Sequence, residues 1–256
     1  MVEERFRDIF EPHPDVDELL PPELGALRRF HPQLVVNFHG GTRSAWMTAL
    51  SGAPHRAGFG HFRQQFVYNL HIPRAQQILG EERTVHTAEH LASAMFWLGA
   101  ARCEVPRAQM VSGAVGPAQP LAVIHPAGAT PEKTWRPDGF REVAEHLRES
   151  GLDVVFIGSA EDDLSPFDGF PVLSGRSLAE IKDVLAKASL FVGNDSGPAH
   201  MAAAFGLPVV VIFGKSDPAI WGPWRTASEV VTARGGVAGV AAAQVIAATA
   251  RLRVHA

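Results

Sequence analysis

The chain has 256 residues, of which 46% are hydrophobic and 20% are charged, and its formal net charge is −4. This composition is too apolar for a disordered chain, and the net charge argues against a nucleic-acid partner held by bulk charge. Cys103 is the single cysteine, which excludes an intrachain disulfide and a cysteine-rich metal site.

The cysteine content also bears on location, because a reducing cytoplasm disfavours disulfides. The first residues lack the basic and apolar regions of a signal peptide, and no apolar run reaches the length of a membrane span. We therefore expect a cytoplasmic protein. Peripheral contact with the inner face of the cytoplasmic membrane is left open.

The first half of the chain, residues 1–112, contains few segments that resemble central strands. A strand is predicted at 34–38, a short helix at 42–50 and a longer helix at 86–98. A doubly wound domain normally opens with a strand and a glycine turn, whereas this chain opens with a charged stretch. We interpret this half as an incomplete acceptor-side domain that lacks its first strand–turn–helix unit.

The second half, residues 118–256, alternates strands and helices after a small, proline-interrupted linker at 107–120. Ser177 and Glu180 form a capping-box pattern that begins one of these helices. The other predicted helices lie at about 137–149, 197–205 and about 237–252. The predicted strands lie at 121–126, 153–158, 189–193, 208–213 and near 229–232. This alternation predicts an α/β fold with a doubly wound parallel sheet.

The most informative stretch is 190–214, in which a buried strand, a polar turn, a short helix and a second buried strand follow one another. Asp195, Ser196 and Gly197 stand where the strand ends and the helix begins. Free backbone N–H groups and the helix dipole favour an anion at such a point. His200 falls about one turn into the helix. The pattern predicts a small site for a phosphate or a sugar phosphate.

Three segments of this chain resemble the signature of the heptosyltransferase family of glycosyltransferases. They are Asn194-Asp195-Ser196-Gly197-Pro-Ala-His200, Gly206-Leu-Pro208 and Phe213-Gly214-Lys-Ser-Asp217-Pro218. The resemblance implies the type B glycosyltransferase fold, with two Rossmann-like domains of which the N-terminal one is truncated here. It further implies transfer of a heptose or related sugar from a nucleotide sugar, with ADP-heptose expected. The expected acceptor is a lipid-linked saccharide of the lipopolysaccharide core, and the reaction inverts the sugar without a metal or another cofactor.

Three loops of the second half carry the donor side of this resemblance. The segment 125–135 resembles the family's lysine-bearing loop, and Lys133 is a mobile charge suited to neutralising a diphosphate. The segment 158–161 resembles the loop whose glutamate meets the donor ribose. Lys133 and His200 are expected to stabilise the leaving group, and Asp195 to orient the loop or hold a sugar hydroxyl. The predicted donor-binding residues are Gly128, Ala129, Thr130, Lys133, Glu161, Asp195, Ser196, Gly197 and His200.

Each of these side chains also has a simpler interpretation when taken alone. Lys133 would be a solvated loop lysine, Asp195 the N-cap of a helix and His200 a half-buried helix histidine. Their joint occurrence on strand-end loops of one sheet favours the functional interpretation.

The first half of the chain resembles the family's acceptor domain through weaker sequence features. His39 and Arg43 are the residues predicted to contact the acceptor. In the family, an aspartate after the first strand of the acceptor domain is held to deprotonate the acceptor, and that strand would lie upstream of Met1. His39, beside two glycines, is the best substitute, although a turn histidine that contacts backbone or acceptor needs nothing special. Either the numbered chain starts late, or it is a nucleotide-sugar-binding relative without efficient transfer. An epimerase or hydrolase of the same fold is a further alternative.

A second histidine pattern, His86-Thr-Ala-Glu89-His90, matches the inverted zinc-protease motif. Zinc needs a third protein ligand, and no suitable acidic cluster follows in the sequence. We interpret this pattern as the amino-terminus of a helix that faces the cleft.

Overall fold

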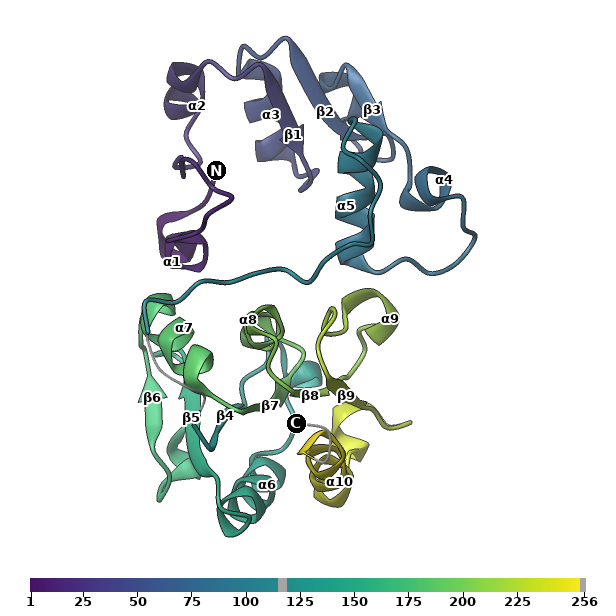
Figure 1. Cartoon of the computed structure of the whole chain (residues 1–256). Coiled ribbons are helices and arrows are strands. Elements are labelled where there is room, and N and C mark those ends of the chain that lie inside the picture. Colours follow the sequence, from purple (N-terminus) through teal and green to yellow (C-terminus); the bar gives the residue numbers. More distant parts are fainter. Residues whose placement is uncertain (115–118, 254–256) are drawn as a thin grey trace. The chain divides into compact units, whose positions relative to one another are not determined.

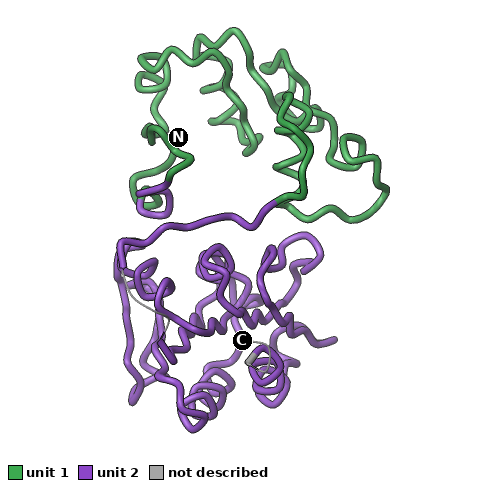
Figure 2. The backbone as a smooth tube through the Cα atoms, in the orientation of Figure 1, with its two compact units in different colours: residues 1–7, 14–105 green, residues 8–13, 106–256 purple. Residues whose placement is uncertain are grey.

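The computed structural model describes residues 1–114 and 119–253 and forms two compact units (Figures 1 and 2). Unit 1 contains Met1–Arg7 and Pro14–Val105, and unit 2 contains Asp8–His13 and Pro106–Ala256. Each unit is an α/β structure built on a parallel sheet, as the predicted fold class requires. Residues 115–118 of the predicted linker lie outside the described residues.

Unit 2 is built on a six-stranded parallel sheet in the order β6-β5-β4-β7-β8-β9. Counted from β4, this is the strand order 3-2-1-4-5-6 of a doubly wound sheet, and the order reverses between β4 and β7. The strands are β4 (Leu121–His125), β5 (Asp153–Gly158), β6 (Val172–Ser174), β7 (Leu190–Asn194), β8 (Val209–Ile212) and β9 (Ser228–Val231).

Helices cover both faces of this sheet, because side chains of each strand alternate between two apolar clusters. Ile124 of β4 packs in the cluster of α6 and α10, whereas Val123 packs in the cluster of α7 and α8. The helices of unit 2 are α6 (Pro137–Glu149), α7 (Leu178–Lys187), α8 (Gly197–Phe205), α9 (Pro218–Trp221) and α10 (Ala242–Arg253). Short 3-10 turns are η3 (Pro131–Lys133), η4 (Ser165–Phe167) and η5 (Gly236–Gly239).

The predicted capping box is confirmed, because the Ser177 hydroxyl accepts from the Glu180 N–H at 3.2 Å. The predicted helix at about 237–252 is wrong at its start. The 3-10 turn η5 occupies its first residues, and α10 begins only at Ala242. Val240, which follows this turn, has an extended backbone with φ −77° and ψ 123°, so no helix continues through it. Strand β6 and helix α9 were not predicted.

Unit 1 is built on a three-stranded parallel sheet in the order β1-β2-β3, from β1 (Leu34–Asn37), β2 (His55–Phe59) and β3 (Leu70–Ile72). Its helices are α2 (Leu24–Phe30), α3 (Thr42–Leu50), α4 (Ala75–Leu79) and α5 (Thr87–Trp97), with the 3-10 turns η1 (Glu4–Phe6) and η2 (Gln65–Val67). Helix α1 (Arg7–Phe10) begins in unit 1 and ends in unit 2.

The middle strand β2 escaped prediction because it is short and contains Gly58. A Cβ added to Gly58 would lie 2.7 Å from the Tyr68 ring, so this position accepts no side chain. The Asn37 amide donates to the Tyr68 hydroxyl at 2.9 Å and fixes the ring over the strand. The strand is therefore specified by a contact distant in sequence rather than by its own pattern.

The segment Asp8–His13 packs on α7 of unit 2. The Lys182 ammonium group, in a residue only 3% exposed, donates to the Asp8 carbonyl at 2.5 Å and to the Glu11 carbonyl. The Ala179 N–H donates to the Asp8 carboxylate at 3.3 Å. These bonds attach the amino-terminal segment to the first turns of α7. Among the described residues, no helix is both long and apolar enough to span a bilayer.

Candidate functional site

The candidate site lies at the carboxyl ends of β4 and β7, where the strand order of unit 2 reverses. The two strands are hydrogen-bonded neighbours, and His125 at the end of β4 pairs in register with Gly193. The loop 126–135 follows β4, and the turn 195–196 follows β7 and leads into α8. In open α/β sheets, ligands bind in the crevice at such a reversal.

Lys133 and Asp195 form an ion pair at this edge of the sheet. The Lys133 Nζ lies 2.8 Å from the Asp195 Oδ2, with the lysine side chain 32% exposed and the aspartate side chain 9% exposed. Lys133 ends the 3-10 turn η3, which begins after Thr130, and its N–H donates to the Thr130 carbonyl at 2.9 Å. The structure thus brings together two predicted residues that lie 62 positions apart.

The start of α8 adds further predicted residues to the same edge. The N-cap of α8 is Ser196 rather than Asp195, and its side chain makes no capping hydrogen bond. The Ser196 hydroxyl instead lies 3.1 Å from the His125 Nδ1. Gly197 opens the helix, and His200 is exposed on it rather than half-buried. The first amides of α8 are therefore left without a side-chain cap, beside the ion pair.

Asn194 holds the loop 126–135 in place, a role that was not predicted. Its side chain is fully buried, accepts from the Trp135 N–H at 3.1 Å and donates to the Pro126 carbonyl at 2.7 Å. One amide thus joins both ends of the lysine-bearing loop to the end of β7. The sequence signals for this residue were its position at the end of a buried strand and its place at the start of the segment 194–200.

Gly128 is required because the same loop closes tightly on itself. A Cβ on Gly128 would lie 2.7 Å from the Lys133 carbonyl oxygen. Thr130 accepts from the Thr134 hydroxyl at 2.9 Å, and Ala129 beside it is exposed. Close backbone approach therefore shapes the turn that presents Lys133.

Glu161 lies on the neighbouring loop after β5 and is exposed. Within the described residues its carboxylate has no hydrogen-bond or ion-pair partner, whereas Asp162 accepts from the Ser159 N–H at 2.7 Å. A pocket of about 240 Å³ lies between this loop and the lysine-bearing loop, and both Gly128 and Asp162 line it. Neither Glu161 nor Lys133 lines this pocket, so Glu161 is placed only as an exposed carboxylate on the neighbouring loop.

The predicted acceptor residues His39 and Arg43 lie in unit 1, after β1 and at the start of α3. The His39 Nδ1 accepts from the Gly41 N–H at 3.2 Å, so the ring shapes its own turn. Arg43 donates to the Pro22 carbonyl at 3.0 Å. This geometry matches the simpler interpretation of His39 as a turn histidine. Because Nδ1 accepts, the ring nitrogen that carries the hydrogen is Nε2, which can donate to a partner but cannot take a proton from one.

The histidine pattern at 86–90 serves as a helix cap. The His86 Nδ1 accepts from the Ala88 N–H at 3.1 Å, and Glu89 pairs with Arg83 at 2.6 Å. The His90 ring stacks on Phe59, with centroids 4.2 Å apart. Among residues 1–114 and 119–253, no group of three or more His, Cys, Asp or Glu side chains is arranged to hold a metal ion.

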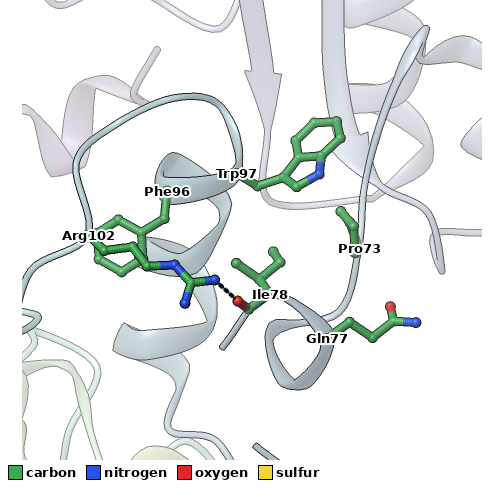
Figure 3. A pocket seen from close by; sticks show the side chains of 6 residues that line it. All are labelled: Pro73, Gln77, Ile78, Phe96, Trp97 and Arg102. Carbon is green, nitrogen blue, oxygen red and sulfur yellow. Dashed lines mark hydrogen bonds between the residues drawn. The ribbon is translucent and has the colours of Figure 1, made fainter. Parts of the chain in front are cut away.

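Unit 1 also holds a pocket of about 430 Å³ between α4 and the end of α5 (Figure 3). Arg102 borders it and donates to the Ile78 carbonyl, which ties the segment after α5 to the end of α4. Neither His39 nor Arg43 lines this pocket. Its lining residues are Pro73, Gln77, Ile78, Phe96, Trp97 and Arg102.

His125 gives the candidate site a measurable pH signature. Burial lowers the pKa of this histidine, which is 9% exposed, to about 4 from an ordinary value near 6.5. Between these two values the unfolded chain binds more protons than the folded chain. Stability is therefore complete above about pH 6.5 and is lost as the pH falls toward 4.

We expect His125 to account for a fall of about 2 kcal/mol in the free energy of unfolding between pH 7 and pH 5. Urea unfolding of the wild type and of His125→Gln at both pH values measures this. The variant should lose the part of the pH dependence that His125 causes. Burial also lowers the pKa values of His61 and His90, and these two residues contribute equally to the pH dependence of both proteins. An identical slope in the two proteins would contradict the assignment.

Comparison with known proteins bears on both units. The family model described as "Glycosyltransferase family 9 (heptosyltransferase)" matches residues 25–238. "Lipopolysaccharide heptosyltransferase 3" of Escherichia coli K12 is 34% identical over 122 residues, which are 43% of this chain but only 36% of that protein.

Two solved structures share the architecture. The glycosyl transferase family 9 protein of Veillonella parvula superposes with a TM-score of 0.83 at 20% identity, over 99% of this chain and 87% of the other. The E. coli heptosyltransferase WaaC with ADP gives a TM-score of 0.72 at 21% identity, over 90% and 75% of the two chains. Both units therefore have the fold of these glycosyltransferases.

Proposed function

The chain belongs to glycosyltransferase family 9, the heptosyltransferase family, and from this premise we propose that it transfers a heptose or a related sugar from a nucleotide-diphosphate donor. The proposed acceptor is a saccharide of the lipopolysaccharide core type. The heptosyltransferase WaaC, which shares the fold, was solved with ADP, so ADP is the first donor nucleotide to test.

One observation carries this proposal: the Lys133–Asp195 ion pair lies beside the uncapped start of α8, at the reversal point of the sheet. A diphosphate at that point would meet the lysine charge, the Ser196 and Gly197 amides and the positive end of the helix dipole. Glu161, on the next loop, would accept hydrogen bonds from the ribose. Under this proposal, the cationic groups bind the diphosphate and the acidic group binds the ribose.

The chemical step that we propose is attack of an acceptor hydroxyl on the anomeric carbon, opposite the leaving group. The new C–O bond forms as the bond to the nucleoside diphosphate breaks, which inverts that carbon, and the hydroxyl proton passes to water. Lys133, His200 and the α8 amides would stabilise the charge that develops on the leaving phosphate oxygens, without a metal ion. Asp195 would hold Lys133 in position, because their atoms already lie 2.8 Å apart. Donor binding thus uses unit 2, and His39 and Arg43 of unit 1 would contact the acceptor.

A second function, nucleotide-sugar binding without efficient transfer, is favoured by the geometry of His39. Its Nδ1 is engaged by the Gly41 N–H, as in a structural turn. The two functions separate in one assay, because both predict ADP binding whereas only the first predicts transfer of sugar to an acceptor. We propose that the chain acts in the cytoplasm, at the membrane where a lipid-linked acceptor is presented.

Titration calorimetry with ADP tests the donor site. Lys133→Ala is expected to weaken ADP binding by about 1–3 kcal/mol, the range for losing a charge-assisted contact. Lys215→Ala is the matched control, because the Lys215 side chain is 72% exposed and pairs with Glu132, the residue before Lys133 on the loop 126–135. Equal ADP affinity in the wild type and both variants would reject the site.

A further inference from the structure

Positive charge is concentrated in one part of unit 1. From Leu24 to Gly80 the chain contains no aspartate, glutamate or lysine, although Glu23 and Glu81 bound this stretch. Its charged residues are Arg28, Arg29, Arg43, Arg56, Arg63 and Arg74. A segment with six formal positive charges therefore lies within a chain whose net charge is −4. It includes the whole sheet of unit 1 and helices α2, α3 and α4 (Figure 1).

Large apolar side chains are exposed on the same segment. Trp46 of α3 is 50% exposed, Leu50 is 46% exposed and Phe66 of η2 is 71% exposed. The Trp46 and Phe66 rings meet edge to face, with centroids 6.3 Å apart. Trp46 and Leu50 are four residues apart and so share one face of α3, opposite the buried Ala45.

Two arginines frame these apolar side chains. Arg28 donates from Nε to the Leu50 carbonyl at 2.7 Å, which places its guanidinium group at the end of α3. Arg43, three residues before Trp46, lies at the other end of the same face. Neither arginine forms an ion pair in the part of the chain that the structure describes. We call Arg28, Arg43, Trp46, Leu50 and Phe66 the aromatic–arginine face.

We propose that the aromatic–arginine face docks on an anionic phospholipid surface. Indole and phenyl rings settle at the headgroup level of a bilayer, and arginines beside them are attracted by anionic lipid. A second copy of the chain would bring unpaired arginines against unpaired arginines, which disfavours self-association through this face. The choice of a bilayer rests on the proposed lipid-linked acceptor, whereas the docking itself needs no transfer activity.

Sedimentation with sucrose-loaded vesicles tests this proposal. One set contains phosphatidylcholine alone, and the other contains phosphatidylglycerol in addition. The wild type is expected to sediment with the anionic set, and Arg28→Gln combined with Arg43→Gln to weaken that partition about tenfold or more. Trp46→Ala combined with Phe66→Ala should weaken it about tenfold. Trp221→Ala is the matched control, because Trp221 is 48% exposed on unit 2 and should leave partition unchanged.

The ADP affinity of each variant serves as the check that it is folded. The proposal is overturned if the wild type ignores anionic vesicles, if it binds both vesicle sets equally, or if both double variants bind like the wild type. It is also overturned if Trp46→Ala abolishes a dimer and leaves vesicle binding intact, since a second copy would then cover the face. If the wild type binds anionic vesicles but shows no transfer activity, the membrane-docking proposal is supported and the proposed transferase function is contradicted.

Discussion

Replacing Lys133 by alanine is expected to lower the rate of sugar transfer at saturating donor about 10²- to 10³-fold. The leaving diphosphate gains negative charge as its bond to the sugar breaks, and a fixed positive group contributes most at that moment. Removing one such group from a catalytic site costs about 2.7–4 kcal/mol. Lys133 is suited to this role because Asp195 fixes its ammonium group at 2.8 Å while a third of its side chain stays exposed.

Steady-state kinetics with a nucleotide-heptose donor and a core saccharide measure this effect. Donor affinity should fall as well, by the roughly 1–3 kcal/mol expected for ADP, so kcat is compared at saturating donor to isolate the chemical step. Lys215→Ala, on the exposed Lys215–Glu132 pair, should keep the wild-type rate. A Lys133→Ala enzyme with kcat within about threefold of the wild type would remove Lys133 from the chemical step.

Replacing Asn194 by alanine is expected to destabilise unit 2 by about 2–4 kcal/mol. The substitution leaves the buried Trp135 N–H and the Pro126 carbonyl without their partner, and each unpaired buried group costs about 1–3 kcal/mol. The loop 126–135 would lose its attachment to β7 at both ends, so donor affinity should fall as well.

The structure offers a closely matched control for this substitution. Asn69 makes the same pair of backbone bonds, accepting from the Arg56 N–H at 2.8 Å and donating to the Pro54 carbonyl at 2.7 Å, but it is exposed. Water can replace both bonds there, so Asn69→Ala should cost about 1 kcal/mol or less. Hydrogen exchange of the β4 and β7 amides, and of the β2 amides for Asn69→Ala, reports the two costs. Equal losses of stability in Asn194→Ala and Asn69→Ala would contradict the prediction that burial makes the hydrogen bonds of Asn194 the more costly to lose.

The strands of unit 2 were predictable because their patterns are local. Runs such as 209–212 are apolar and β-branched, and Ser177 with Glu180 marks a helix start without reference to the rest of the chain. The predicted strand at 153–158 and helix at 197–205 have the predicted bounds. Both faces of the sheet are covered, so the interior residues of the central strands are apolar and the signal is strong.

Unit 1 was harder to predict because long-range contacts decide its strands. Strand β2 contains Arg56 and Gly58, and its glycine is required only because the Tyr68 ring packs over it. The proximity of Lys133 and Asp195 could be predicted because both follow strands that end at the same edge of one sheet, but the ion pair between them was not predicted. The roles of Asn194 and His125 could not be predicted in this way. Their partners, a loop backbone and the Ser196 hydroxyl, are set by the fold rather than by a spacing.

The segment Asp8–His13 also determines how the chain could be divided. Because this segment groups with unit 2 while the residues on both sides of it group with unit 1, the backbone passes from one unit to the other three times. A fragment that starts at Pro106 would lose the Asp8 and Glu11 carbonyls to which the Lys182 ammonium group donates, and would uncover the part of α7 on which this segment packs. A donor-binding fragment should therefore be made by supplying residues 8–13 as a separate peptide or by fusing them ahead of residue 106. Any hinge motion of the units must in turn bend three connections together.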